Sequence, residues 1–127
     1  MGARKRITKQ SDETSPPSER AFLRFYYSES LRERTLAVLT TLEQGEDTRR
    51  NRAALAEVVL ELSDSGMDYY YLRPLRLAKV GSVVEQSAQF GIGGFTWIMA
   101  PVIRRIIGRM DNQQVLTICS HIRELMD

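Results

Sequence analysis

The chain has 127 residues, of which 43% are hydrophobic and 27% charged, and its formal net charge at neutral pH is +2. This length and composition predict one globular domain whose core is large enough to fold without disulfides or metals. A single cysteine, Cys119, excludes an internal disulfide framework and a multi-cysteine zinc site. On the same ground we expect a reducing, cytoplasmic location.

The N-terminal segment is basic and polar. Residues 1–17 hold no large apolar side chain except Met1 and Ile7, so they cannot bury enough surface to offset the entropy of ordering. We therefore expect a disordered tail over residues 1–17, without the apolar run of a secretory signal, and a helical bundle domain over residues 18–127. Because this end of the chain accounts for the whole net charge, the remainder gives no sign of a basic nucleic-acid-binding body.

The first predicted helix carries two apolar stripes. Ser18 is its expected N-cap, and the helix runs from Glu19 to about Gln44, where Gly45 ends it. The stripes lie on nearly opposite sides, with Phe22, Phe25, Tyr26 and Leu36 on one and Tyr27, Leu31, Val38 and Leu42 on the other. Such a helix either occupies the centre of a bundle or faces a second molecule, and both alternatives are open.

The second predicted helix, from near residue 47 to near residue 66, begins with three arginines. Arg49, Arg50 and Arg52 stand in its first turn, where the helix dipole favours acidic side chains instead. Beside the free N–H groups of a helix start, they could bind a phosphate or a carboxylate. A solvated cluster balanced by neighbouring carboxylates is the simpler interpretation.

A third helix is expected to begin near Leu75, because Pro74 disfavours helix before it and suits a first turn. The tyrosines at positions 69–71 would then lie at this turn, where they could stack on bases, bind a partner or cap the end of the bundle. We favour capping, with at least one ring accessible. A helix-turn-helix here would need polar base-reading side chains after the turn, so DNA binding is not expected.

An uncharged run extends from Gln86 to Ile103. It contains about 14 predominantly apolar residues, whereas a bilayer span needs roughly 20, so no transmembrane segment is expected. No strand precedes its glycines and no Lys-Ser/Thr pair follows them, which argues against a phosphate-binding loop. The simplest interpretation is that Gly91 ends one helix and that Gly93 and Gly94 turn the chain into the next.

The fourth predicted helix extends from Phe95 to about Met110. Its expected inward arc consists of Phe95, Ile98, Met99, Val102, Ile103, Ile106 and Met110. If Pro101 does not break the helix, Trp97 and Arg104 share the opposite face. Trp and Arg are frequent at interface hot spots and also suit a lipid headgroup boundary. The alternative is that Trp97 packs beneath the first helix.

The last predicted helix begins with a capping box formed by Asp111 and Gln114. Cys119 falls on its apolar face as a small buried hydrophobe, and His121 points away from it as a lone surface histidine. No set of side chains along the chain has the spacing of a catalytic or metal site. We therefore expect no cofactor and no metal, and the sequence favours a role other than catalysis.

These patterns predict an all-α bundle of about five helices. The preferred function is a non-catalytic protein–protein interaction module that self-associates, with a homodimer expected. Its candidate partner-binding residues are Trp97, Arg104, Arg105, Arg109, Tyr27 and Leu31. The alternative is a peripheral binder of an anionic membrane surface, acting through the basic tail and the region of Trp97, Arg104, Arg105 and Arg109. An enzyme with an unrecognised site is third.

Overall fold

The computed structural model describes residues 25–126, and every regular element within that range is helical, which confirms the all-α class. The elements are α2 (Glu29–Glu43), α3 (Arg49–Met67), the π-helical turn η2 (Asp68–Leu72), α4 (Arg73–Leu77), α5 (Ser82–Arg109) and α6 (Asn112–Met126). The expected tail, the N-cap at Ser18 and the apolar residue Phe22 lie outside the described residues.

Helix α2 begins later than the sequence pattern predicts. Residues 25–28 are not helical, so the expectation of a helix running unbroken through them is wrong. Ser28 is the N-cap, and its hydroxyl oxygen accepts a hydrogen bond from the N–H of Leu31 at 3.0 Å. This bond satisfies an N–H group that has no partner within the helix. Gly45 follows the other end with a φ of +93°, as its predicted role requires.

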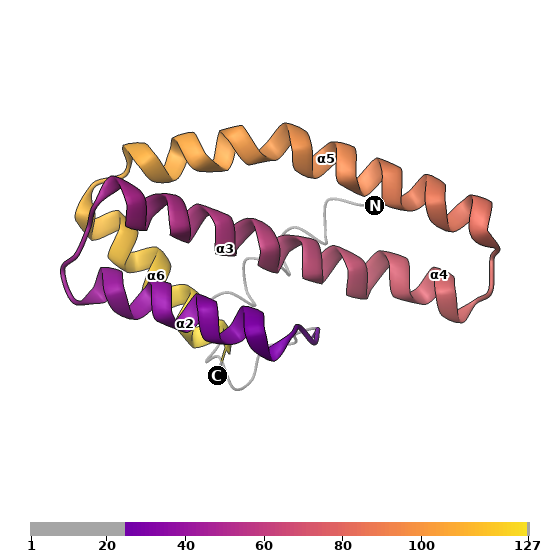
Figure 1. Ribbon diagram of the computed structural model, residues 1–127, viewed down its shortest axis with the longest axis horizontal. Coiled ribbons are helices and arrows are strands. Elements are labelled where there is room, and N and C mark those ends of the chain that lie inside the picture. Colours follow the sequence, from indigo (N-terminus) through magenta and orange to yellow (C-terminus); the bar gives the residue numbers. More distant parts are fainter. Residues whose placement is uncertain (1–24, 127) are drawn as a thin grey trace, which may run out of the picture.

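The core lies where α2, α3 and α6 pack together, at the end of the molecule where α5 meets α6 (Figure 1). Its fully buried side chains come from these three helices: Leu39, Leu42, Leu55, Val115 and Cys119. Leu36 and Val38, from the two predicted stripes of α2, both pack against this cluster. Helix α2 therefore packs against two helices of its own chain, α3 and α6, which accounts for both stripes without a subunit interface.

Helix α3 continues through η2 into α4 and forms one long path (Figure 1). Pro74 therefore lies inside a helical segment, and the predicted helix start near Leu75 is wrong. A proline ring clashes with the carbonyl of the preceding turn, and the wider π-helical turn placed immediately before it makes room. The chain reverses after α4 at Lys79 and Gly81, whose φ values are +54° and +103°.

Helix α5 is a single helix of 28 residues, so the predicted break at Gly91 and the predicted turn at Gly93 and Gly94 are wrong. None of these glycines has a positive φ, and Pro101 is accommodated within the helix. Helix α5 runs back along α3 and α4 (Figure 1). The face toward α3 holds partly buried residues, namely Ile92, Thr96, Met99 and Ile103.

This inward face differs from the predicted one. Phe95 and Ile98, expected in the core, are 51% and 62% exposed, and Val102 and Ile106 are exposed as well. Helix α5 is apolar on most of its circumference, so periodicity alone could not select the side that docks.

The predicted capping box at the start of α6 is confirmed, since Asp111 and Gln114 exchange hydrogen bonds of 2.8 and 2.9 Å.

Candidate binding surface on α5

The outer face of α5 is the most apolar exposed surface of the described chain. Of the 28 residues of α5, all within the described range, Ile107 alone is buried. Its exposed large hydrophobic residues are Val83, Val84, Phe90, Phe95, Trp97, Ile98, Val102 and Ile106. Each aromatic ring among them could bury roughly 150–250 Å². Monomeric proteins rarely expose a contiguous apolar patch beyond roughly 300–600 Å², so this surface is expected to be covered by something.

The arrangement of these side chains follows helical spacing. Val84, Phe95, Ile98, Val102 and Ile106 form one stripe, because their positions recur on the same side of a helix. Phe90 and Trp97, seven residues apart, lie at the other edge of the exposed side, about 120–140° around the helix from Val102, and are 86% and 79% exposed. No charged residue interrupts the face between Gln86 and Ile103. The face is therefore an uncharged strip about 27 Å long, at 1.5 Å of rise per residue, and it is apolar from Phe90 onward.

Glycines occupy the middle of this strip. A Cβ atom added to Gly91, Gly93 or Gly94 would meet nothing within 4 Å. No contact within the described chain therefore requires a glycine at these positions, although each weakens the helix relative to alanine. The backbone of α5 is consequently open on its outer side, between the large rings of Phe90 and Trp97.

Two side-chain pairs join α5 to α3 along its length. The Thr96 hydroxyl donates a hydrogen bond of 2.8 Å to Asp64, and the Arg104 guanidinium pairs with Glu57 at 2.9 Å. Arg104 is thus engaged within the chain but remains half exposed. It also lines a hollow of about 470 Å³ together with Trp97, Ile98 and Pro101, so the unbroken helix brings Trp97 and Arg104 together as expected.

Arg52 secures the C-terminal end of α5. Its guanidinium donates to the carbonyl oxygen of Ile107 at 3.2 Å and to that of Met110, and it forms an ion pair with Asp47. Asn112 of α6 donates to the same carboxylate at 2.8 Å. These bonds lower the pKa of Asp47 to about 2, the bond from Arg52 having the largest effect. Arg52 therefore caps a helix end and is not free to bind an external anion.

The other sequence-predicted site residues are dispersed. Arg49 and Arg50 are exposed in the first turn of α3 without an ion pair among residues 25–126, so they alone remain of the candidate anion site. Leu31 is 4% exposed within the chain, so it offers little surface for the predicted contact with a partner. Tyr27 is partly buried, and its ring is tilted against that of Phe25 with the centroids 5.8 Å apart. Trp97, Arg105 and Arg109 are exposed on one helix.

The tyrosines before α4 pack against the segment that precedes α2. The ring of Tyr69 contacts those of Tyr26 and Tyr70 edge-on, with centroids 5.8 and 5.6 Å apart, and the Arg73 guanidinium lies 5.1 Å from the Tyr69 centroid. Tyr71 is 64% exposed, which confirms that one of the three rings is accessible. This cluster closes the end of α2 and fits the predicted capping role.

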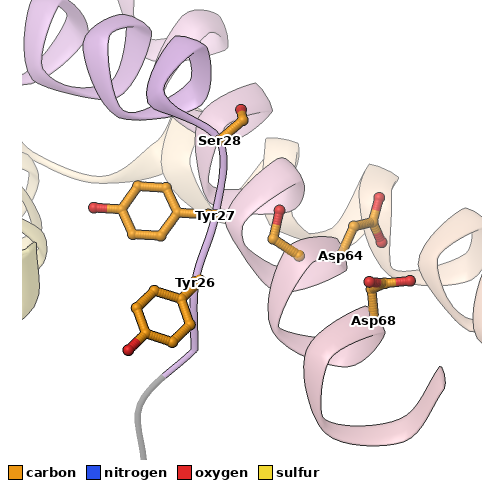
Figure 2. A pocket seen from close by; sticks show the side chains of 6 residues that line it. Tyr26, Tyr27, Ser28, Asp64 and Asp68 are labelled. Carbon is orange, nitrogen blue, oxygen red and sulfur yellow. The ribbon is translucent and has the colours of Figure 1, made fainter. Parts of the chain in front are cut away.

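A hollow lies beside this cluster, between the segment that precedes α2 and the C-terminal part of α3. It has a volume of about 430 Å³ and is lined by Tyr26, Tyr27, Ser28, Asp64, Ser65 and Asp68. Figure 2 shows that the rings of Tyr26 and Tyr27 point away from the helix that carries Asp64 and Asp68. The Ser28 hydroxyl already caps α2. Within residues 25–126, no three His, Cys, Asp or Glu side chains are grouped to hold a metal ion.

Charge is strongly segregated in the described chain. Residues 73–109, which we call the α4–α5 segment, contain six basic residues and one acidic residue. The other described residues, 25–72 and 110–126, contain six basic and eleven acidic residues. The overall balance predicted for the body of the chain therefore conceals a net charge of +5 on the apolar segment and of −5 on the remainder. This asymmetry becomes visible only when charge is counted by segment, because the total charge of the chain conceals it.

Comparison with known proteins gives no direct assignment. Searches against protein-family models, curated proteins and solved structures found no match. By length and composition α5 could cross a membrane, a test that core helices of globular proteins also pass. Helix α5 differs from such core helices because its apolar side chains are mostly exposed. The surface of α5 is therefore the feature from which a function can be argued.

Proposed function

We propose that the protein is a non-catalytic attachment module, in which α2, α3 and α6 form the scaffold and the outer face of α5 binds. The observation that carries this proposal is the exposure of eight large hydrophobic side chains along a helix that buries Ile107 alone. Fully burying one such side chain is worth about 1.5–3 kcal/mol. A partner that covered several of them would gain enough free energy to remain attached.

Side-chain chemistry supports attachment over catalysis. Ser120, His121 and Glu124 line one hollow on α6, but within residues 25–126 no hydrogen bond joins a serine or cysteine to a histidine or carboxylate. A helix cap accounts for Ser28, and an ion pair accounts for Asp47 and Arg52. The thiol of Cys119 is fully buried, and burial raises its pKa, which disfavours the reactive thiolate. Trp97, Arg105 and Arg109 keep the binding role expected of them, now on a surface made by α5 alone.

Self-association is one way to cover this face. Helix α2 gives it no further support, but α5 offers a second copy an uncharged strip with an open backbone at Gly91 and Gly94. A homodimer through α5 would be symmetric, with the same patch contributed by both chains. The predicted dimer therefore stands as a proposal about α5.

The test compares polar substitutions on and off the proposed face. Ile98→Ser on α5 is matched by Leu125→Ser on α6, because both side chains are exposed, at 62% and 71%. Attachment is measured by sedimentation over a concentration series and by flotation with lipid vesicles. We expect the wild-type chain to associate in one of these assays, and Ile98→Ser alone to weaken the association. A wild-type chain that stays monomeric in buffer and does not float with any vesicle would refute the proposal.

A further inference from the structure

We propose that the outer face of α5 binds an anionic lipid bilayer, and that α5 lies in the plane of the interface without crossing it. This inference rests on the proposed attachment function and names the partner of the same face. Three features of the molecule support it: the placement of charge, the dimensions of the apolar strip, and the contacts between α5 and α3.

Charge placement distinguishes an anionic surface from other partners. Arg105 and Arg109 follow Ile98 and Val102 by seven residues, so they lie on the same outer side of α5 as the apolar stripe. Neither arginine forms an ion pair with a residue in the range 25–126. At the opposite end of the strip, Lys79 is exposed in the turn between α4 and α5. Basic side chains thus flank the apolar strip at both ends.

The acidic residues lie elsewhere. The only acidic side chain of the α4–α5 segment is Glu85, which is partly buried. On α3, Glu57 is already paired with Arg104, and Asp64 accepts a hydrogen bond from Thr96. A bilayer with anionic headgroups would attract the segment of net charge +5 and leave the part of net charge −5 directed away. The protein therefore has a built-in orientation toward a negative surface.

The dimensions fit an in-plane helix. An interfacial helix buries its apolar face roughly 5–10 Å into the boundary between headgroups and acyl chains. Phe90 and Trp97, at the other edge of the exposed side, would lie at the level where aromatic rings are favoured, and the arginines and Lys79 would reach phosphates at either end. No other described helix covers the outer side of α5, which runs beside α3 and α4 with a gentle bow (Figure 1).

A second copy fits the same face less well. Symmetric pairing of two α5 faces would bring together two segments that each carry a net charge of +5. The arginines that remain unpaired within the described chain would then face basic residues of the other copy at both ends. Like charges at close range oppose such an association, whereas anionic lipids remove the conflict.

A membrane-spanning α5 conflicts with its docking on α3. The Thr96–Asp64 hydrogen bond and the Arg104–Glu57 ion pair hold the two helices together. A spanning α5 would either break these contacts or carry the carboxylates of α3 into the hydrocarbon region, where charge is strongly disfavoured. An in-plane orientation keeps both contacts and leaves α3 on the aqueous side.

The test measures flotation of the purified full-length chain with vesicles of phosphatidylcholine alone or mixed with an equal part of phosphatidylglycerol. Arg105→Gln/Arg109→Gln removes two charges from the proposed face. Arg49→Gln/Arg50→Gln removes two exposed charges from the start of α3 and serves as the matched control. The N-terminal tail is the same in both variants, so its basic residues cannot account for a difference between them.

We expect binding to the mixed vesicles only, falling steeply as salt is raised. The α5 pair should weaken it by about thirtyfold, from the usual contribution of each basic residue near an anionic surface, and the control pair by less than about threefold. Trp97 is the only tryptophan, and its emission should shift to shorter wavelength on binding. Alkaline carbonate should release the bound protein, as it does a peripheral protein.

Each contrary outcome has a defined meaning. Equal binding to neutral vesicles, equal effects of the two arginine pairs, or resistance to carbonate would overturn the in-plane anionic surface. A chain that ignores vesicles but dimerises in buffer, with the dimer lost in Ile98→Ser, would also overturn it while leaving the attachment function intact. A chain that does neither would refute both proposals.

Discussion

The two parts of the molecule use apolar residues in opposite ways. In the scaffold of α2, α3 and α6, residues such as Leu39, Leu55 and Val115 are fully buried. In the α4–α5 segment, Leu77, Val83 and Phe90 are 72%, 75% and 86% exposed. Both parts have the same local structure, so helix formation does not explain the difference. The apolar side chains of the scaffold stabilise the fold, whereas most of those on α5 exceed what the fold requires.

The position of each part in the chain clarifies this contrast. Helix α5 packs on α3 along its length but joins the core only at its C-terminal end, where Ile107 belongs to the core cluster and Arg52 binds the last carbonyl oxygens. Toward its N-terminus it has only α3, η2 and α4 beside it (Figure 1). A segment packed on one side opens at a lower free energy than a core helix. The exposed face is thus carried by the part of the fold that can adapt to a surface.

The largest expected effect comes from truncating a core leucine. Leu55→Ala should lower the free energy of unfolding by about 2–5 kcal/mol, because it leaves a cavity among fully buried side chains. Ile98→Ala on α5 should change it by less than about 0.5 kcal/mol, as for other exposed positions. Urea unfolding followed by circular dichroism measures both. Comparable losses in the two variants would mean that α5 is covered in the free protein.

A smaller loss is expected when α5 is released from its anchor. Arg52→Ala should cost about 2–3 kcal/mol, since it strands a carboxylate whose side chain is 12% exposed and frees carbonyl groups at the end of α5. Arg50→Ala, on the same helix but exposed, is the control and should stay within about 0.5 kcal/mol. Hydrogen exchange of α5 amides would locate the effect, and unchanged protection there would contradict the proposed anchor.

The same anchor predicts a pH dependence. The pKa of Asp47 is about 2 in the folded chain, below its ordinary value of 3.8, so its ionised form is stabilised by folding. This contribution is fully present above about pH 4 and is lost as the pH falls toward 2. Asp47→Asn should therefore be less stable than the wild type at neutral pH, and the two unfolding curves should converge in acid. A stability difference that persists unchanged at low pH would assign the effect to the side-chain amide and not to charge.

The sequence predicts the scaffold better than the α4–α5 segment, for a physical reason. Scaffold helices have local signals that act alone: Gly45 ends α2, and Asp111 with Gln114 begins α6. Cys119 could be placed in the core because its helix is apolar on one side only. Each of these features depends on a few neighbouring residues, and tertiary packing does not overrule them.

The errors fall where local signals conflict with packing. Glycines in α5 resemble helix stops, but α3 and η2 support the helix through them, and the π-helical turn η2 accommodates Pro74. The face of α5 that docks could not be chosen from an apolar circumference. The candidate surface was therefore identified only in part: Trp97, Arg105 and Arg109 belong to it, whereas Leu31 and Arg52 do not. Charge counted by segment would have indicated it from the sequence.

The smallest expected effect tests whether the middle of the strip is open in the free protein. Gly91→Ala and Gly94→Ala each place a methyl group where nothing lies within 4 Å, in a helix whose φ values suit any residue. Alanine favours helix over glycine by about 0.8–1 kcal/mol, so each variant should raise the melting temperature slightly. Gly81→Ala is the contrasting control, because its φ of +103° strains any side chain and should make that variant less stable. If the alanine variants on α5 were also less stable in dilute buffer, a close neighbour, either a second copy or residues 1–24 of this chain, would have to cover the glycines there.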